Sequence, residues 1–376
     1  MERLGLVGLP NAGKSSLFNA LTTGHALVAS HPFSTTETSS GVARVPDHRL
    51  DALAAMSKSR KVVHATIEVV DIAGLVAGSS TGEGLGNRFL GGLREADGLC
   101  FVLRAFDDAE IPGETDPVAA LEVLELELVL ADAAAVDVQL DKRRRAAKAD
   151  KGAARGAARL EAFASLLGEG TPLYRAPLSD EERAEASGLF LLTAKPVIAV
   201  VNIGEDDVDR APALVAEVAA ALQGTRPPSS GAADGETPAG GDEDAVVAAP
   251  VRLEAEAAQV DEAERDELRE GLGLGEGVLL RAARAAYHRL GRRTFLTTGD
   301  KESRAWTFRE GSTAPECAGV IHSDLQRGFI RAEVVRWDEL LEIGSWAAAK
   351  AAGRLRVEGK DYVVVDGDVL EIRFNV

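Results

Sequence analysis

The sequence feature that most constrains this chain is the run Gly8-Leu9-Pro10-Asn11-Ala12-Gly13-Lys14-Ser15. It matches the pattern G-x-x-x-x-G-K-[ST] in full, follows an apolar run at residues 3–7 and precedes a helical pattern from Lys14 through Leu21. In such a loop the glycines let backbone N–H groups surround a phosphate, the lysine reaches the β- and γ-oxygens, and the hydroxyl binds Mg²⁺. The run therefore predicts a strand, a loop and a helix that bind a nucleoside triphosphate. The residues predicted to contact the nucleotide here are Asn11, Ala12, Gly13, Lys14, Ser15 and Ser16.

Two later segments are predicted to complete the phosphate and metal site. Asp71-Ile72-Ala73-Gly74 matches D-x-x-G at the end of a β-rich run, where the Asp71 carboxylate would bind Mg²⁺ through water and the Gly74 N–H would contact the γ-phosphate. Thr35 lies between the two motifs and is predicted to close over both groups. Thr36 competes for that role, and a plain Ser/Thr-rich loop is the alternative. The predicted metal ligands are Ser15, Thr35 and Asp71. The predicted catalytic residues are Lys14, Thr35 and Gly74.

The nucleotide base is predicted to lie against Asn202-Ile203-Gly204-Glu205, which follows another apolar run. GTP-binding proteins carry N-K-x-D here, and its aspartate accepts two hydrogen bonds from guanine. In this chain Ile203 replaces the lysine and Glu205 replaces the aspartate. Because adenine has a donor at its 6-amino group where guanine has an acceptor, the altered segment favours ATP over GTP. The predicted base contacts are Asn202, Ile203 and Glu205.

Four short β-rich apolar runs indicate a parallel sheet. They occupy residues 3–7, 65–71, 98–106 and 196–202, and helical patterns alternate with them. Continuous apolar strands are typical of a sheet that is covered on both faces, and alternation with helices is typical of parallel strands. The predicted fold class is therefore α/β, with a doubly wound P-loop NTPase domain. We assign residues 1–117 and 192–288 to this domain.

Residues 118–191 interrupt the α/β pattern with a helical insert. Leucines recur at helical spacing from Leu121 to Leu130, and a second apolar series follows later in the segment. This spacing predicts two long helices that form an antiparallel coiled-coil hairpin. Gly152 and Gly156 are predicted to mark its turn.

Charge is distributed unevenly along the chain. The formal net charge is −18, which argues against a protein that coats nucleic acid, and no DNA partner is expected. Residues 142–159 of the insert nevertheless contain eight Lys/Arg and one acid, Asp150. A basic segment on an acidic protein favours one specific polyanion contact. A solvated helix face is the alternative.

The remaining parts of the chain predict an insertion and a small second domain. Residues 223–245 are rich in Pro, Gly, Ser and acids, which predicts a disordered insertion within the P-loop domain. Residues 291–376 contain short β-rich runs and the helix-forming segment DELLEIGSWAAAKAAG, which predicts a small α+β domain. The two cysteines are far apart, the histidines are scattered, and no run of about 18 apolar residues occurs. We therefore expect no disulfide framework, zinc site or membrane partner, and a cytoplasmic location.

Taken together, these segments resemble the YchF/Obg-like ATPase family of Obg-related P-loop proteins. The resemblance covers nearly the whole chain except residues 223–245. It rests on GLPNAGKSSLFNAL, DIAGLVAGSSTGEGLGNRFL, LLTAKPV with the N-x-x-E that follows, RAWTFREGSTAPECAGVIHSDLQRGFIRAEV and EGKDYVVVDGDVLEIRFNV. It implies a β-grasp-like TGS domain at residues 291–376 and slow ATP hydrolysis, with GTP used less well. It also implies a nucleotide-dependent regulator of translation or stress that binds the ribosome, with large-subunit rRNA as the expected contact of residues 142–159.

The resemblance also identifies features that bear on turnover. Leu75 stands where a glutamine usually orients the attacking water, and some of the group use K⁺ held partly by an asparagine at the position of Asn11, so K⁺ is a candidate second ion beside Mg²⁺. The loop from Phe106 to Pro117 lacks a histidine that the family usually carries, and Pro250-Val251-Arg252 stands where S-A-K is usual. A nucleotide-binding regulatory protein with negligible turnover is therefore one alternative. A conventional GTPase is another, although N-x-x-E disfavours it.

Overall fold

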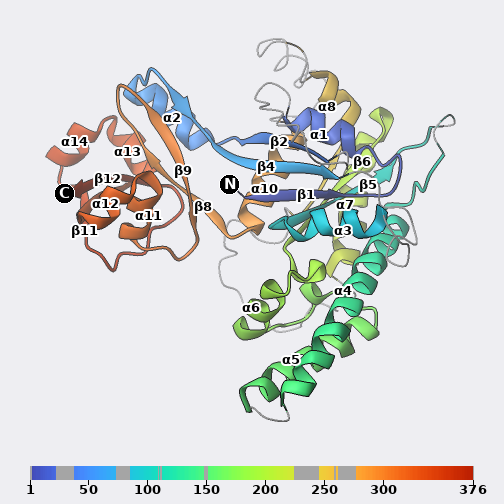
Figure 1. The fold of residues 1–376 in the computed structure, drawn as a ribbon. Coiled ribbons are helices and arrows are strands. Elements are labelled where there is room, and N and C mark those ends of the chain that lie inside the picture. The colour runs from blue at the N-terminus through green and yellow to red at the C-terminus, as the bar shows by residue number, and fades with distance from the viewer. Residues whose placement is uncertain are drawn as a thin grey trace, which may run out of the picture. The chain divides into compact units, whose positions relative to one another are not determined.

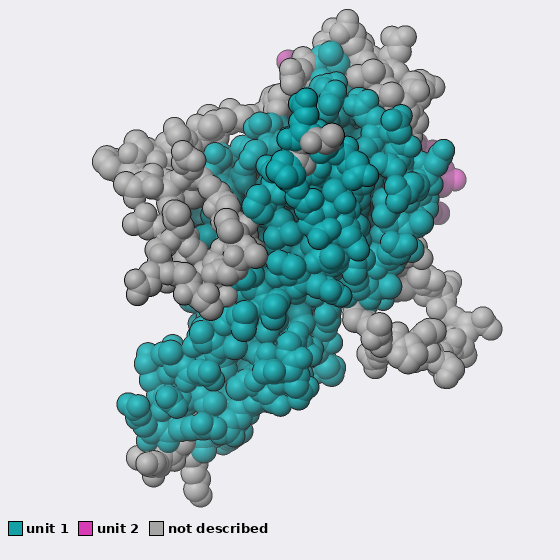
Figure 2. Space-filling model, turned by 90° about the vertical axis from the view of Figure 1, so that its right-hand side faces the viewer, with its two compact units in different colours: residues 1–43, 68–286 teal, residues 44–67, 287–376 magenta. Residues whose placement is uncertain are grey.

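The chain forms two compact units (Figures 1 and 2). The first contains residues 1–43 and 68–286, and the second contains residues 44–67 and 287–376. Each unit is thus assembled from two pieces that are separated in the sequence. The computed structural model describes residues 2–22, 38–72, 85–108, 110, 112–147, 151–223, 245–257, 260 and 277–375.

A six-stranded sheet forms the centre of the first unit. Its strand order is β2-β4-β1-β5-β6-β7, and the neighbouring pairs from β4 to β7 are parallel. The strands are β1 (Arg3–Val7), β2 (Thr38–Val45), β4 (Ala65–Ile72), β5 (Gly98–Ala105), β6 (Val197–Ile203) and β7 (Val246–Ala249). The four predicted strands and the α/β class are confirmed. Nearly every residue of β5 and β6 is buried, as their continuous apolar sequences require.

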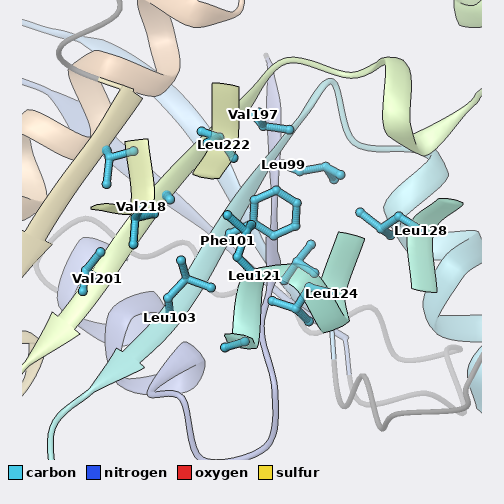
Figure 3. Packing of buried hydrophobic residues seen from close by; sticks show 14 of the residues in the cluster. Leu99, Phe101, Leu103, Leu121, Leu124, Leu128, Val197, Val201, Val218 and Leu222 are labelled. Carbon is cyan, nitrogen blue, oxygen red and sulfur yellow. The ribbon is translucent and has the colours of Figure 1, made fainter. Parts of the chain in front are cut away.

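Helices α4 (Pro117–Ala147) and α7 (Ala211–Gln223) pack on this sheet. Figure 3 shows the contact, in which alternate side chains of β5 meet side chains of both helices: Leu99, Phe101, Leu103, Leu121, Leu124, Val218 and Leu222. Burial of each such side chain contributes about 1.5–3 kcal/mol. Helix α1 (Lys14–Thr22) packs against α8 (Val251–Ala257), and α3 (Leu85–Arg94) joins the core through Phe89, Leu90 and Leu93. Helix α10 (Val278–Arg289) begins in the first unit and ends in the second.

The predicted hairpin is formed by α4 and α5 (Lys151–Gly168), which pack along each other and extend away from the sheet (Figure 1). Two details of the prediction were wrong. Gly152 and Gly156 lie inside α5, not in a turn, because glycine is tolerated in a helix at a cost of about 1 kcal/mol. Leu130 does not face the core: it is 45% exposed. No helix among the described residues is long and apolar enough to span a bilayer.

Shorter helices join the hairpin to the sheet. These are η1 (Leu173–Arg175), α6 (Asp180–Gly188) and η2 (Leu192–Ala194). Asp132 of α4 is fully buried and accepts hydrogen bonds from the backbone N–H groups of Leu192 and Thr193, at 3.0 and 2.7 Å. These bonds attach the first half of α4 to the segment that leads into β6. The predicted insertion at residues 223–245 lies almost wholly outside the described residues.

The second unit contains the predicted small α+β module. Its sheet order is β11-β10-β12-β8-β9-β3. The strands are β3 (Val62–Val63), β8 (Arg292–Thr297), β9 (Ser303–Arg309), β10 (Phe329–Arg336), β11 (Arg356–Glu358) and β12 (Asp368–Phe374). The helices are α2 (His48–Ser57), α11 (Ala314–Ile321), α12 (Ser323–Arg327), α13 (Trp337–Ile343) and α14 (Trp346–Ala351). The single predicted helix-forming segment is two helices, because Gly344 adopts a left-handed φ of 88° after α13.

Residues 44–67 pack with the C-terminal residues, although we assigned them to the P-loop domain from the sequence. The guanidinium group of Arg49 pairs with Asp47 at 2.7 Å and with Asp366 at 2.5 Å. Burial alone would lower the pKa of Arg49, but the two carboxylates outweigh it and raise the pKa above its ordinary value. In addition, β3 pairs with β9, and the Thr298 hydroxyl donates to the Leu53 carbonyl oxygen at 3.2 Å. Apart from Asp47, these partners lie more than 200 residues downstream, so no local signal could have predicted them.

Candidate nucleotide-binding site

A pocket of about 820 Å³ lies at the carboxyl ends of the parallel strands of the first unit. Ligands bind at this edge in open α/β sheets, and the volume is within the usual range for small-molecule sites, roughly 300–1,000 Å³. The pocket brings together the predicted nucleotide contacts from two distant segments: Asn11, Ala12, Gly13, Lys14, Ser15, Ser16, Asn202, Ile203 and Glu205. The segments meet because β1, β5 and β6 are parallel neighbours.

The loop after β1 has the backbone shape of a phosphate-binding loop. Asn11 and Gly13 have positive φ angles, 63° and 95°. Asparagine and glycine are the residues that adopt such angles at least cost. At Gly8, a Cβ atom would lie 2.6 Å from the carbonyl oxygen of Val102, so only glycine fits there. The glycines of the motif are therefore required by the structure itself, independently of any ligand.

Lys14 begins α1 and bends back over the loop. Its ammonium group donates to the carbonyl oxygens of Gly8 and Leu9, at 2.8 and 3.3 Å. Burial lowers the pKa of Lys14, and the negative charge of Asp71 opposes this shift. The lysine thus sits as a partly buried cation at the mouth of the loop, where an anionic ligand would compensate its charge.

Ser15 and Asp71 lie side by side. The Ser15 hydroxyl donates to the Asp71 carboxylate at 2.8 Å, and Asp71 is brought there because it is in register with Leu6 of β1. A hydroxyl and a carboxylate are hard oxygen donors of the kind that Mg²⁺ prefers, and Mg²⁺ usually takes one or two such protein ligands together with phosphate and water. The pair therefore fits the predicted magnesium site. Thr35 and Gly74, which were predicted to complete it, lie outside the described residues.

Asn202 is buried at the end of β6 and holds the phosphate-binding loop in place through a hydrogen bond. Its side-chain amide donates to the Ala12 carbonyl oxygen at 3.0 Å, and its side-chain oxygen accepts from the Val251 N–H at 3.3 Å. A Cβ atom on Gly13 would lie 2.3 Å from this amide nitrogen. One buried side chain therefore fixes the phosphate-binding loop to the first residue of α8.

The loop after β5 closes another side of the pocket. Phe106, Asp107 and Asp108 line the pocket, and the Asn11 side-chain amide donates to the Pro112 carbonyl oxygen at 3.0 Å. The loop then ends at Asp116, whose carboxylate accepts from the N–H of Val118 in the first turn of α4 at 2.9 Å. This segment, which contains no histidine, is thus attached to the phosphate-binding loop and to the hairpin.

Several lining residues were not predicted as site residues. They are Ala105, Phe106, Asp107, Asp108, Gly204, Asp206, Asp207, Arg210, Pro250 and Arg252. Ala105 is the last residue of β5 and the others follow β5, β6 or β7; the carboxyl ends of adjacent parallel strands meet at one edge of a sheet. The strands β5 and β6 were predicted, so their following residues could have been included. The strand β7 was not predicted, so Pro250 and Arg252 were noted from the resemblance as the residues at the S-A-K position but were not predicted as site residues.

Comparisons with known proteins agree with this geometry. A family model for 50S ribosome-binding GTPases matches residues 3–140, and a model named YchF-GTPase C-terminal, described as a protein of unknown function, matches residues 293–375. The ribosome-binding ATPase YchF of Bacillus subtilis is 40% identical over 381 residues, 99% of both chains. Its counterpart in Escherichia coli O157:H7 is 41% identical over 380 residues, 100% of this chain and 99% of the relative.

A solved structure matches over the same extent. The YchF GTPase of Schizosaccharomyces pombe superimposes with a TM-score of 0.82 at 32% sequence identity, covering 99% of this chain and 97% of that one. Similarity at this level extends through both compact units.

Proposed function

The chain belongs to the YchF family, and from this premise we propose that it is a ribosome-associated ATPase. The observation that carries the proposal is the pocket in which the P-loop, Asp71 and the N-x-x-E segment converge. Relatives of nearly the same length are ribosome-binding ATPases. We propose that ATP is the preferred nucleotide, that GTP is used less well, and that the protein acts in the cytoplasm.

Each side chain of the pocket has a proposed task. The N–H groups of residues 11–16 and the Lys14 ammonium group bind the phosphates, which orients the γ-phosphate toward the loop after β4. Ser15, Asp71 and Thr35 would hold Mg²⁺. When bound, that ion offsets the negative charge that develops on the phosphate oxygens. Gly74 would donate its N–H to the γ-phosphate. Lys14, Thr35 and Gly74 are the proposed catalytic residues.

The rate of hydrolysis tests the proposal. We expect purified protein to release phosphate from ATP slowly and faster with ribosomes present, and Lys14→Ala to abolish both rates. Malachite-green detection under single-turnover conditions measures them. Equal release by wild type and Lys14→Ala would contradict ATP hydrolysis at this site.

A second candidate function is nucleotide-dependent regulation with negligible turnover. It is favoured by Leu75, which cannot orient water, and by a loop after β5 that carries no histidine. Tight ATP binding without ribosome-stimulated phosphate release would support this candidate over the first. We also propose that Asn11 contributes to a K⁺ site. Equal hydrolysis rates in Na⁺ and K⁺ buffers would count against K⁺.

The proposed ribosomal contact is rRNA of the large subunit, at the basic part of the hairpin. The matching family of 50S ribosome-binding GTPases supports the choice of subunit. Within residues 142–159, Arg143, Arg144 and Arg159 already pair with glutamates of α5 and α6. Lys142, Arg145 and Arg155 are exposed and have no ion-pair partner among the described residues. These three side chains are therefore the proposed phosphate contacts.

Charge reversal separates the two kinds of basic residue. The triple variant Lys142→Glu, Arg145→Glu, Arg155→Glu should weaken ribosome co-sedimentation by about tenfold or more and flatten its salt dependence, because each lost phosphate contact removes counterion release. The control is Arg144→Gln, which removes one charge that is already paired. If the triple variant pellets with ribosomes as the wild type does, this rRNA contact is refuted. The proposal that the protein hydrolyses ATP would still stand.

A further inference from the structure

A buried arginine lies beside the phosphate-binding loop without a counter-charge. Arg104 is the penultimate residue of β5, in register with Asn202 of β6, and is only 2% exposed. Its Nε atom donates to the Phe106 carbonyl oxygen at 2.9 Å, and its guanidinium carbon lies 4.4 Å from the centre of the Phe106 ring. In the part of the chain that the structure describes, its Nη1 atom has no hydrogen-bond partner and its charge forms no ion pair.

The unpaired nitrogen lies where the loop after β5 meets the phosphate-binding loop. A Cβ atom on Gly113 would lie 3.1 Å from the Arg104 Nη1 atom and 3.7 Å from the Pro10 carbonyl oxygen, so the Gly113 backbone is close to both. The neighbouring Pro112 carbonyl oxygen accepts from the Asn11 amide at 3.0 Å, and Asn11 lines the nucleotide pocket. The guanidinium group is therefore near the pocket but beneath its surface, and it can act on a ligand through its charge.

An unpaired buried charge is unfavourable unless another group offsets it. Moving a charge out of water has a large free-energy cost, which proteins normally offset with an oppositely charged partner. Arg175 in the same unit has such a partner, because it pairs with Glu125 at 2.6 Å. The phosphates of a nucleotide in the adjacent pocket would bring negative charge close to Arg104. Since the effective dielectric constant of a protein is lower than that of water, this attraction is stronger than between two exposed charges.

We propose that Arg104 is a specificity-determining residue for the number of phosphates: its unpaired charge makes the pocket favour a nucleoside triphosphate over a diphosphate. The inference rests on the proposed function, because it concerns the nucleotide bound in that pocket. Arg104 adds a buried cation to the contacts made by Lys14 and by the N–H groups of the loop. Its charge destabilises the nucleotide-free protein and stabilises the complex, so the two effects of the residue are opposed.

Nucleotide binding by a charge-removing variant tests the proposal. Arg104→Met keeps a long, flexible side chain and removes the charge. Dissociation constants for ADP and for the non-hydrolysable β,γ-imido analogue of ATP are measured by calorimetry with Mg²⁺. We expect the variant to bind the ATP analogue about tenfold more weakly and ADP only about twofold more weakly, because the analogue carries about one more negative charge. Arg104→Lys retains a charge and should keep most of the wild-type ratio of the two constants.

Unfolding experiments distinguish a charge that serves the ligand from one that serves the fold. Without nucleotide, the urea midpoint of Arg104→Met should be no lower than that of wild type, because an apolar group replaces an unpaired buried charge. A saturating concentration of the ATP analogue should stabilise the variant less than it stabilises wild type. Arg175→Met is the matched control: it leaves Glu125 without its partner, so it should lower the urea midpoint and leave the ratio of the two dissociation constants unchanged.

Two results would overturn the inference. One is a ratio of the two dissociation constants in Arg104→Met that equals the wild-type ratio, even if both constants rise. The other is an Arg104→Met variant that is unfolded without nucleotide, since Arg104 would then serve the fold. In either case, wild type that binds the ATP analogue leaves the ATPase proposal standing. Wild type that binds neither nucleotide would overturn both proposals.

Discussion

The nucleotide pocket and the α4–α5 hairpin are both rich in polar and charged side chains, but internal contacts have opposite consequences in them. In the pocket, Asn202 and Lys14 bond to backbone carbonyl oxygens and hold the loop in the shape that a phosphate needs. In the hairpin, Arg143, Arg144 and Arg159 pair with glutamates, which removes them from the charge available to a partner. Internal hydrogen bonds therefore shape the nucleotide pocket, whereas internal ion pairs reduce the positive charge that the hairpin can offer to a partner.

The sharpest test of this difference places the same substitution in each region. In Gly13→Ala the added Cβ would lie 2.3 Å from the buried amide of Asn202, at a φ of 95°. The strain of that backbone for alanine is about 1–2 kcal/mol, and displacing Asn202 breaks two hydrogen bonds of about 1 kcal/mol each. We expect affinity for the ATP analogue, the non-hydrolysable β,γ-imido form, to fall about 100-fold or more, since each 1.4 kcal/mol is a factor of ten. Calorimetry measures it.

Gly156→Ala is the matched control in the hairpin. Its Cβ would lie even closer to another group, 2.1 Å from an Arg143 terminal nitrogen, but that nitrogen is the end of a flexible side chain. Alanine also favours a helix over glycine by about 1 kcal/mol, which offsets a weakened ion pair. Urea unfolding should show a change within about 1 kcal/mol. Equal free-energy losses from Gly13→Ala and Gly156→Ala would mean that the pocket is no more rigid than the hairpin.

The same contrast explains what could be predicted from the sequence. The P-loop motif fixes its own strand, loop and helix, because each residue acts on neighbours a few positions away. The strands β5 and β6 were evident because a buried parallel strand is apolar throughout. The partners of Asn202 and Arg143 could not be predicted, nor could the pairing of Arg49 with Asp366, since these residues lie 42 to 317 positions apart in the sequence. Charge counting in residues 142–159 therefore overstated the free positive charge.

Removal of the Asn202 side chain should have the next largest effect on nucleotide affinity. Asn202→Ala leaves the Ala12 carbonyl oxygen and the Val251 N–H without their partner in a buried place. An unsatisfied buried group costs about 1–3 kcal/mol, so we expect roughly tenfold weaker binding of the ATP analogue and a lower free energy of unfolding. Asn202→Asp keeps the acceptor for Val251 and should lose less stability. Wild-type affinity in Asn202→Ala would show that the loop keeps its shape without the Asn202 side chain.

Proton uptake should accompany nucleotide binding in the pocket. Burial lowers the pKa of Lys14 below its ordinary value of 10.5, with Asp71 opposing the shift. Bound phosphate adds negative charge and raises the pKa again. Between the lower and the higher pKa, binding takes up a proton, so affinity is full at neutral pH and falls as pH rises through the lowered pKa. Above that pKa the loss approaches about tenfold per pH unit.

Calorimetry in two buffers of different ionisation enthalpy measures this uptake. The observed binding enthalpy should depend on the buffer as the pH rises toward the ordinary lysine pKa of 10.5, because the lowered pKa of Lys14 in the free protein lies below that value. Lys14→Met removes the titrating group and should abolish the dependence in whatever binding remains. An enthalpy that is the same in both buffers would show that the loop holds Lys14 fully protonated before the nucleotide arrives.

The smallest expected effect concerns a single ion pair of the hairpin. Arg144 and Glu161 approach to 2.9 Å, but their side chains are 56% and 50% exposed. Water screens such a pair, so a double-mutant cycle with Arg144→Ala and Glu161→Ala should give a coupling energy below about 0.5–1 kcal/mol that vanishes in 1 M salt. Arg159 bridges Glu181 and Glu185, and the Glu185 side chain is mostly buried, so the cycle of Arg159 with Glu185 should give the larger coupling.

The weak ion pair between Arg144 and Glu161 still matters for function, because it neutralises a positive charge of the hairpin. Loss of Glu161 alone should therefore strengthen ribosome co-sedimentation slightly, and weaker pelleting of that variant would show that the paired arginines, too, contribute to binding.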